Sequence, residues 1–157
     1  MSRALGSAPR GFPRRLATLG VALASLGAAA GCGPEGPRPL RAFSQSYEFR
    51  VTSDPSPPRA REVTNYRITV LDRESRRVID RGEGQIFATS NDRVNVYDSF
   101  EPAPEAGTYT ARISYITAGD WKVGLRFRRD STAALERPED WVQTVRGARP
   151  ISERPIN

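Results

Sequence analysis

Carboxylates are the side chains of this sequence best suited to acid–base chemistry, because the chain contains no histidine. Histidine is the usual general base near neutral pH and the commonest metal ligand, so serine–histidine triads, histidine–zinc sites and histidine-ligated haem are excluded. A pair of acids can hydrolyse glycosides when their pKa values are pushed apart. The acids in predicted loops and turns are Asp92, Asp98, Glu101 and Glu105. Their spacing singles out no pair, and solvated acids are expected in loops, so we predict no catalytic residues.

Two other combinations of polar residues have side chains that could bind a metal ion or act as a nucleophile and base. Residues 90–92 (Ser-Asn-Asp) and Asp98 offer oxygen ligands, but the spaced repeat of acids that typifies a calcium loop is missing, so we predict no metal site. Ser114 and Lys122 would form a serine–lysine dyad if they met across a hairpin. Both alternate with apolar residues and should face water as a solvated pair. The sequence therefore predicts a protein that is not an enzyme and that uses no cofactor.

The single cysteine, Cys32, lies at the end of a predicted signal peptide. Residues 1–15 contain four arginines and no acid, and the uncharged stretch 16–26 that follows is rich in Leu and Ala. The Ala-Ala-Gly-Cys motif of residues 29–32 resembles the bacterial lipoprotein signal, although Ala replaces the usual Leu three positions before the cysteine. In that family the cysteine is lipidated and becomes the new N-terminus. Cleavage by the ordinary signal peptidase near Ala30 is the alternative.

The lipoprotein resemblance implies where the protein is located. Acyl chains on Cys32 would attach the mature chain to a bilayer without embedding it. Gly33 stands where many such lipoproteins carry an Asp that retains them in the inner membrane. The resemblance thus implies lipid anchoring in the cell envelope, at the outer membrane of a Gram-negative bacterium and facing the periplasm. Residues 1–31 are the predicted signal peptide, and residues 32–45, rich in Pro and Gly, are a predicted tether.

The charge of the mature chain argues against nucleic acid as a partner. The chain has 24 Lys and Arg against 18 Asp and Glu, but four of the basic residues lie in residues 1–31. Residues 32–157 therefore carry 20 basic and 18 acidic residues, a net charge of +2. Basic and acidic residues are also interleaved, as in residues 73–77, whereas nucleic-acid binding requires basic residues gathered on one face. We expect a mixed-charge surface, with the membrane and an envelope protein as partners.

Alternating apolar and polar residues predict a fold made of β-strands. The clearest strands are predicted over residues 47–52, 63–71, 107–115 and 121–127, and less regular ones over residues 85–89 and 94–97. The last two form the strongest predicted hairpin, across a turn at residues 118–120. About six or seven short strands with no helix between them predict an all-β fold, an immunoglobulin-like antiparallel β-sandwich over residues 46–129.

A short helix is predicted in the C-terminal extension, residues 130–157. Pro138 is a suitable first helical residue, and Gly147 a suitable terminator. Trp141 and the valines at positions 142 and 145 would then form an apolar stripe. The stripe would either dock on the sandwich or contact a partner, and docking is the usual role of large aromatic side chains.

Residues 105–111 resemble the tyrosine corner of immunoglobulin-type domains. In those domains the tyrosine lies two residues before the second disulfide cysteine. Tyr109 would be this tyrosine, and Ala111 stands in place of the cysteine. Because the mature chain has no second cysteine, the predicted sandwich must fold without a disulfide.

A Gly-x-Tyr-x-Ala strand followed by Gly-Asp-Trp is similar to the YtkA/FixH-like family, over about residues 63–128. The residues that carry this resemblance are Gly107, Tyr109, Gly119, Asp120 and Trp121. It implies an immunoglobulin-like domain on the extracytoplasmic side, and some members of the family are linked to copper handling or oxidase assembly. Because such short motifs consist of turn and core residues, they indicate a fold more than a chemistry.

The ligands of copper proteins are missing from the mature chain. Cu(I) selects thiolate and thioether ligands, with imidazole as the other common donor. The sequence has no histidine, its one methionine is residue 1, and lipidation would block Cys32. The leading hypothesis is therefore a non-enzymatic, lipid-anchored envelope protein with an immunoglobulin-like binding module. Copper handling or oxidase assembly is the alternative.

Overall fold

The computed structural model describes residues 38–150, and all of their regular structure is β-strand. The predicted signal peptide, Cys32 and the first part of the tether lie outside the described residues. The nine strands are β1 (Leu40–Phe43), β2 (Tyr47–Asp54), β3 (Val63–Asp72), β4 (Glu83–Ser90), β5 (Asn95–Ser99), β6 (Glu101–Pro102), β7 (Thr108–Ser114), β8 (Gly119–Arg128) and β9 (Trp141–Val145).

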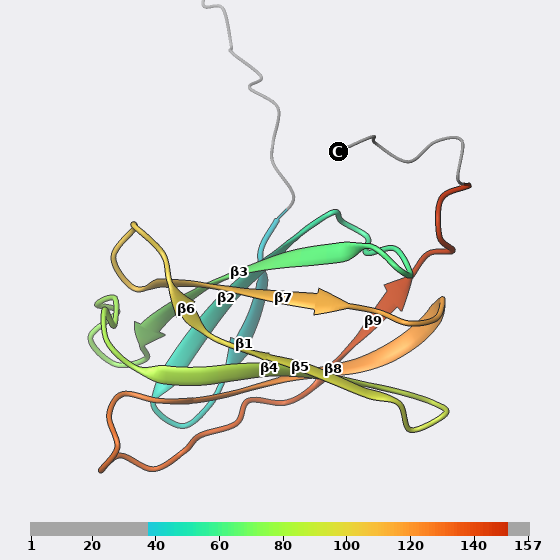
Figure 1. Ribbon diagram of the computed structural model, residues 1–157. Helices are drawn as coiled ribbons and strands as arrows, with labels where there is room; N and C mark the ends of the chain where they lie inside the picture. The colour runs from blue at the N-terminus through green and yellow to red at the C-terminus, as the bar shows by residue number, and fades with distance from the viewer. Residues whose placement is uncertain (1–37, 151–157) are drawn as a thin grey trace, which may run out of the picture. The chain divides into compact units, whose positions relative to one another are not determined.

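The strands form two antiparallel sheets that enclose one core (Figure 1). The five-stranded sheet has the order β1-β2-β3-β7-β6, and the four-stranded sheet has the order β5-β4-β8-β9. Tyr66 and Ile68 of β3 and Trp121, Leu125 and Phe127 of β8 are among the largest fully buried side chains. In the longer strands, such as β3 and β7, side chains alternate between the core and the outside. The prediction of an all-β, two-sheet sandwich is thereby confirmed.

The predicted hairpin over residues 107–115 and 121–127 is wrong. β7 pairs with β3 and β6, whereas β8 pairs with β4 and β9, so the connection passes from one sheet to the other. Tyr115 in this connection is buried, and its hydroxyl forms a hydrogen bond with that of Tyr66. Alternation places apolar side chains toward the core in either sheet, so it predicts strands without predicting their partners.

The predicted C-terminal helix is also wrong, because its central residues form the edge strand β9. Val145 is buried and Trp141 packs against the core, whereas Val142 is exposed. The apolar residues in 141–145 fit the two-residue repeat of a strand as well as an approximate apolar stripe along a helix. The unpaired edge of β8 supplies hydrogen bonds to a strand, whereas a short helix is only marginally stable without packing.

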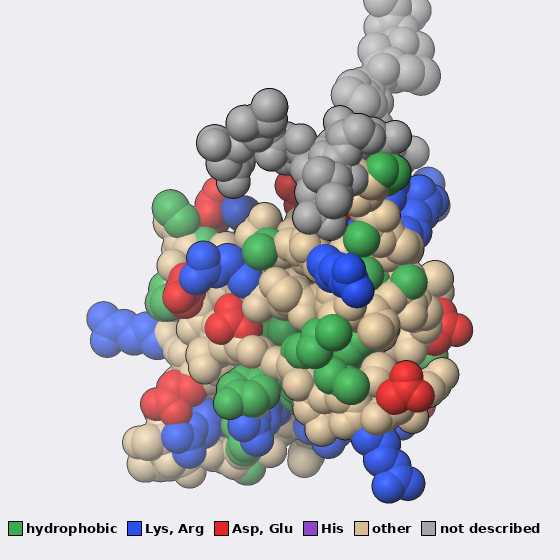
Figure 2. Space-filling model, turned by 45° about the vertical axis from the view of Figure 1, so that its right-hand side comes forward, with side chains coloured by type: hydrophobic (Ala, Val, Ile, Leu, Met, Phe, Trp, Pro, Cys, Tyr) green, Lys and Arg blue, Asp and Glu red, His purple; other side chains and the backbone are tan. Residues whose placement is uncertain are grey.

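Edge strands at both ends extend the folded body beyond residues 46–129. β1 lies in the predicted tether 32–45, and β9 lies in the predicted extension 130–157. Within residues 38–150, no helix is long and apolar enough to cross a membrane. Figure 2 shows one face of the molecule, on which basic, acidic and hydrophobic side chains are interspersed.

Candidate functional site

The acids considered for catalysis are either exposed or held in local contacts. Asp92 and Glu101 are exposed. Asp98 accepts a hydrogen bond from a backbone N–H of β7 at 2.7 Å. Glu105 forms an ion pair with Arg67 at 2.5 Å, and the hydrogen bond from this guanidinium lowers the pKa of Glu105. In the described part of the chain, no group of three or more His, Cys, Asp or Glu residues is placed to hold a metal ion.

Ser114 and Lys122 are exposed and lie in different sheets, Ser114 in β7 and Lys122 in β8. A dyad would require the two side chains to meet across paired strands. The structure does not bring these two strands into a pair.

Gly107 and Tyr109, the first two motif residues, have structural contacts. Gly107 has a φ of +66°, and a Cβ there would lie 2.5 Å from the Cβ of Val78, so this position requires glycine. The hydroxyl of Tyr109 donates to the carbonyl oxygen of Ile79 at 2.8 Å, and burial raises the pKa of Tyr109 to about 12. This acceptor lies 30 residues upstream, whereas a tyrosine corner binds backbone only a few residues upstream. The contact therefore differs from a tyrosine corner.

The other three motif residues form the start of β8. Gly119 has a φ of +120°, which favours glycine. Asp120 accepts a hydrogen bond from the hydroxyl of Thr144 on β9 at 2.8 Å. Trp121 is buried, and its indole N–H donates to the carbonyl oxygen of Thr117 at 3.1 Å. These contacts explain the motif by turn geometry, edge pairing and core packing.

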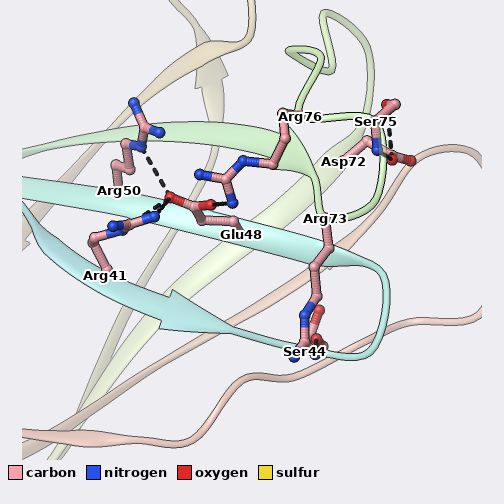
Figure 3. Close-up of polar contacts among 8 residues, drawn as sticks. All are labelled: Arg41, Ser44, Glu48, Arg50, Asp72, Arg73, Ser75 and Arg76. Carbon is pink, nitrogen blue, oxygen red and sulfur yellow. Dashed lines mark hydrogen bonds and ion pairs between the residues drawn. The ribbon is translucent and has the colours of Figure 1, made fainter.

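Glu48 on β2 is a fully buried carboxylate surrounded by three guanidinium groups (Figure 3). Arg41 on β1 donates from Nε and Nη2 to its Oε1 at 3.0 and 2.7 Å. Arg50 on β2 donates from Nε to the same oxygen at 3.0 Å. Arg76, from the turn after β3, donates from Nη1 to Oε2. We call these four residues the arginine cluster.

Strand geometry places the arginine cluster on the outer face of the five-stranded sheet. The register that buries Tyr47 and Phe49 in the core directs Glu48 and Arg50 to the opposite face. Arg41 is the register partner of Arg50 on the neighbouring strand β1. Two of the three arginines are therefore positioned by alternation and strand pairing alone.

The third arginine is positioned by a turn. Arg76 has a φ of +61°, a left-handed conformation that is uncommon for residues other than glycine. Asp72 organises this turn, since the N–H and the hydroxyl of Ser75 both donate to its Oδ1 at 2.9 Å. These hydrogen bonds, together with Arg129, lower the pKa of Asp72. The turn places the guanidinium of Arg76 on Glu48.

The arginine cluster carries a net positive charge. Burial by itself raises the pKa of Glu48, but hydrogen bonds from Arg50 and Arg41 and the charges of Arg41 and Arg76 outweigh this effect and hold the pKa below its usual value. Glu48 is therefore ionised near neutral pH, and the cluster has a net charge of +2. Each arginine side chain is 42 to 50 % exposed, so N–H groups that Glu48 does not use face solvent.

An exposed aromatic ring lies beside the arginine cluster. Phe43 of β1 is 45 % exposed, and the guanidinium carbons of Arg41 and Arg73 lie 5.6 and 5.8 Å from its ring centroid. Arg73 also donates to the carbonyl oxygen of Ser44 at 2.9 Å. Guanidinium groups stay protonated at physiological pH, so this surface is suited to binding oxyanions rather than to moving protons.

Sequence reasoning did not find the arginine cluster. The alternation of residues 47–52 predicts that Glu48 and Arg50 lie on the solvated face of a strand. The local signal is an acid two residues before an arginine, which is common on exposed strands. Arg76, 28 residues from Glu48, is brought to the site only by the tertiary fold.

Comparison with models of known protein families gives no match to this chain, and comparison with curated proteins gives none either. Support for a function comes from the arginine cluster and from the sequence motifs.

Proposed function

We propose that this protein is a non-enzymatic, lipid-anchored binding module that holds an anionic component of the cell envelope on its arginine cluster. The observation that carries the proposal is the set of three half-exposed guanidiniums gathered around the buried carboxylate of Glu48. Guanidinium groups match the geometry of phosphate and carboxylate oxygens. The contacts to Glu48 restrain the arginines, which reduces the entropy lost when a ligand is bound.

We infer that the sandwich is of the immunoglobulin-like type. In such domains strands A, B, E and D form one sheet, and strands C, F and G form the other, with C′ beside C in some members. The orders β2-β3-β7-β6 and β5-β4-β8-β9 correspond to A-B-E-D and C′-C-F-G, with β1 as an added edge strand. The YtkA/FixH-like resemblance stays a prediction.

Anion binding is tested with two variants that change the charge equally. The cluster variant combines Arg41→Gln, Arg50→Gln and Arg76→Gln with Glu48→Gln, which removes three positive charges and one negative charge. The control variant, Lys122→Gln with Arg126→Gln, removes two positive charges from exposed positions of β8. On a phosphocellulose resin the cluster variant should elute at much lower salt than the control. Equal elution of the two variants would contradict the proposal.

Lipid anchoring is tested at Cys32. Cys32→Ser should abolish labelling by radioactive fatty acid and should either release the protein into the soluble envelope fraction or leave an uncleaved precursor. Gly33→Ser, which retains the cysteine, is the control and should be labelled like the unmodified protein. Unchanged processing and membrane attachment of Cys32→Ser would show that the anchor is not at this residue.

Whether the protein is sorted to the inner or to the outer membrane is tested by a substitution at Gly33. Gly33→Asp introduces the residue that retains many lipoproteins in the inner membrane, so the protein should move from the outer-membrane to the inner-membrane fraction on a density gradient. Lipid labelling of Cys32 should be unaffected. An unaltered distribution would argue against the outer-membrane location.

A further inference from the structure

We propose that the anionic component is the lipid surface itself, so that the domain docks through its arginines onto acidic headgroups of the membrane that holds its anchor. This inference rests on the proposed function, because it requires both a lipid anchor at Cys32 and an arginine cluster that binds anions. It adds a second, reversible membrane contact to the covalent anchor. The chemistry recognised would be the phosphate groups of acidic phospholipids.

The charge of the proposed docking surface favours such a ligand. We define the docking surface as Glu48, Phe43 and the four arginines whose side chains contact either of them: Arg41, Arg50, Arg73 and Arg76. Glu48 is the one acid among these six residues, which together carry a net charge of +3, and Asp72 and Glu74 lie beside Arg73 at the edge of this surface. A surface of this charge is attracted to an acidic bilayer.

The exposed ring of Phe43 favours a lipid surface over a purely ionic partner. The guanidinium carbons of Arg41 and Arg73 lie 5.6 and 5.8 Å from the ring centroid. At a membrane interface an aromatic ring enters the boundary between headgroups and acyl chains, while neighbouring arginines remain with the phosphates. An acidic protein surface would satisfy the arginines but would not require an exposed apolar ring among them.

The position of β1 brings this surface close to the predicted anchor. β1 begins at Leu40, eight residues after Cys32, and carries both Arg41 and Phe43. Eight residues span at most about 28 Å when fully extended. The anchor would therefore hold the docking surface near the bilayer, where a weak contact is favoured by its high effective concentration.

The experiment measures vesicle binding without the lipid anchor. Residues 32–157 carrying Cys32→Ser contain all of the described residues 38–150, whose two sheets share one core, and circular dichroism verifies that each variant is folded. We expect co-sedimentation with vesicles of phosphatidylcholine and phosphatidylglycerol, but not with vesicles of phosphatidylcholine alone. Added NaCl should weaken the binding.

Variants locate the contact on the molecule. The cluster variant should bind acidic vesicles about 25-fold more weakly, since each charge near such a surface changes binding about fivefold. The control variant at Lys122 and Arg126 should bind like the unmodified chain. Phe43→Ser changes an exposed residue and should weaken binding, whereas Tyr97→Ser, at an exposed aromatic of the other sheet, should leave it unchanged.

Several results would overturn membrane docking. These are absence of binding, equal binding to both kinds of vesicle, and equal losses in the cluster and control variants. Displacement by inorganic phosphate beyond that caused by NaCl at equal ionic strength would instead identify a site for a small anion. Lipid labelling at Cys32 and retention on phosphocellulose test the proposed function separately. If those two results hold while vesicle binding fails, only membrane docking is rejected.

Discussion

Each sheet carries an acid–arginine contact on its outer face, and the two contacts differ in burial. Glu83 on β4 pairs with Arg128 on β8 at 2.5 Å, and its side chain is 61 % exposed. Glu48 contacts three arginines, and its side chain is 0 % exposed. Water can solvate Glu83 when its partner is lost, so an exposed pair contributes about 0–1 kcal/mol. Glu48 is covered by the arginine side chains, so in the folded protein these partners take the place of water around its carboxylate.

Removal of all three arginines should have the largest effect. Arg41→Gln, Arg50→Gln and Arg76→Gln together remove every charged partner of Glu48, which should lower the free energy of unfolding by about 3 kcal/mol at pH 7 through the loss of charged hydrogen bonds. Arg128→Gln should lower it by less than about 1 kcal/mol. Urea denaturation measures both. Adding Glu48→Gln to the triple variant should restore much of the loss, and a triple variant as stable as Arg128→Gln would invalidate the comparison.

Glu48→Gln alone should have a smaller effect that depends on pH. Loss of the charged hydrogen bonds should cost about 2 kcal/mol at pH 7. Because the pKa of Glu48 is lowered in the fold, its stabilisation is complete above the unfolded value of 4.5 and is lost as the pH falls through the folded value. The difference in stability between the unmodified protein and Glu48→Gln should therefore shrink in acid. A difference that is constant from pH 7 to below the unfolded value would contradict this assignment.

Two of the three arginines that have a left-handed backbone among the described residues provide the smallest and most local test. Arg76 and Arg93 have φ values of 61° and 63°. Arg93→Gly should relieve backbone strain and raise stability by about 0.5–1 kcal/mol. Arg76→Gly gains the same relief but loses its contact with Glu48, so a net loss of about 1 kcal/mol is expected. Thermal unfolding measures the stability of the two variants. An equal gain in stability in both would mean that the contact between Arg76 and Glu48 contributes little.

Local patterns predicted the strands well but not their partners. The alternation at residues 47–52 and 63–71 corresponds to β2 and β3, because burial of one face is encoded residue by residue. The hairpin prediction failed at residues 107–127, where two adjacent alternating segments belong to different sheets. The helix prediction failed at β9, where pairing with an open sheet edge outweighed an approximate helical stripe.

The sequence by itself determined that the fold is all-β with a core between two sheets. It also determined that no histidine is present to act as a base or ligand, and that the single cysteine lies in a lipoprotein-like motif. These features are local, since each can be read from neighbouring residues. Only the tertiary structure decided that Glu48 is buried and that Arg41, Arg50 and Arg76 converge on it. The charge of a side chain is a property of the residue, whereas its burial and its partners depend on strand register and on a turn that lies far away in the sequence.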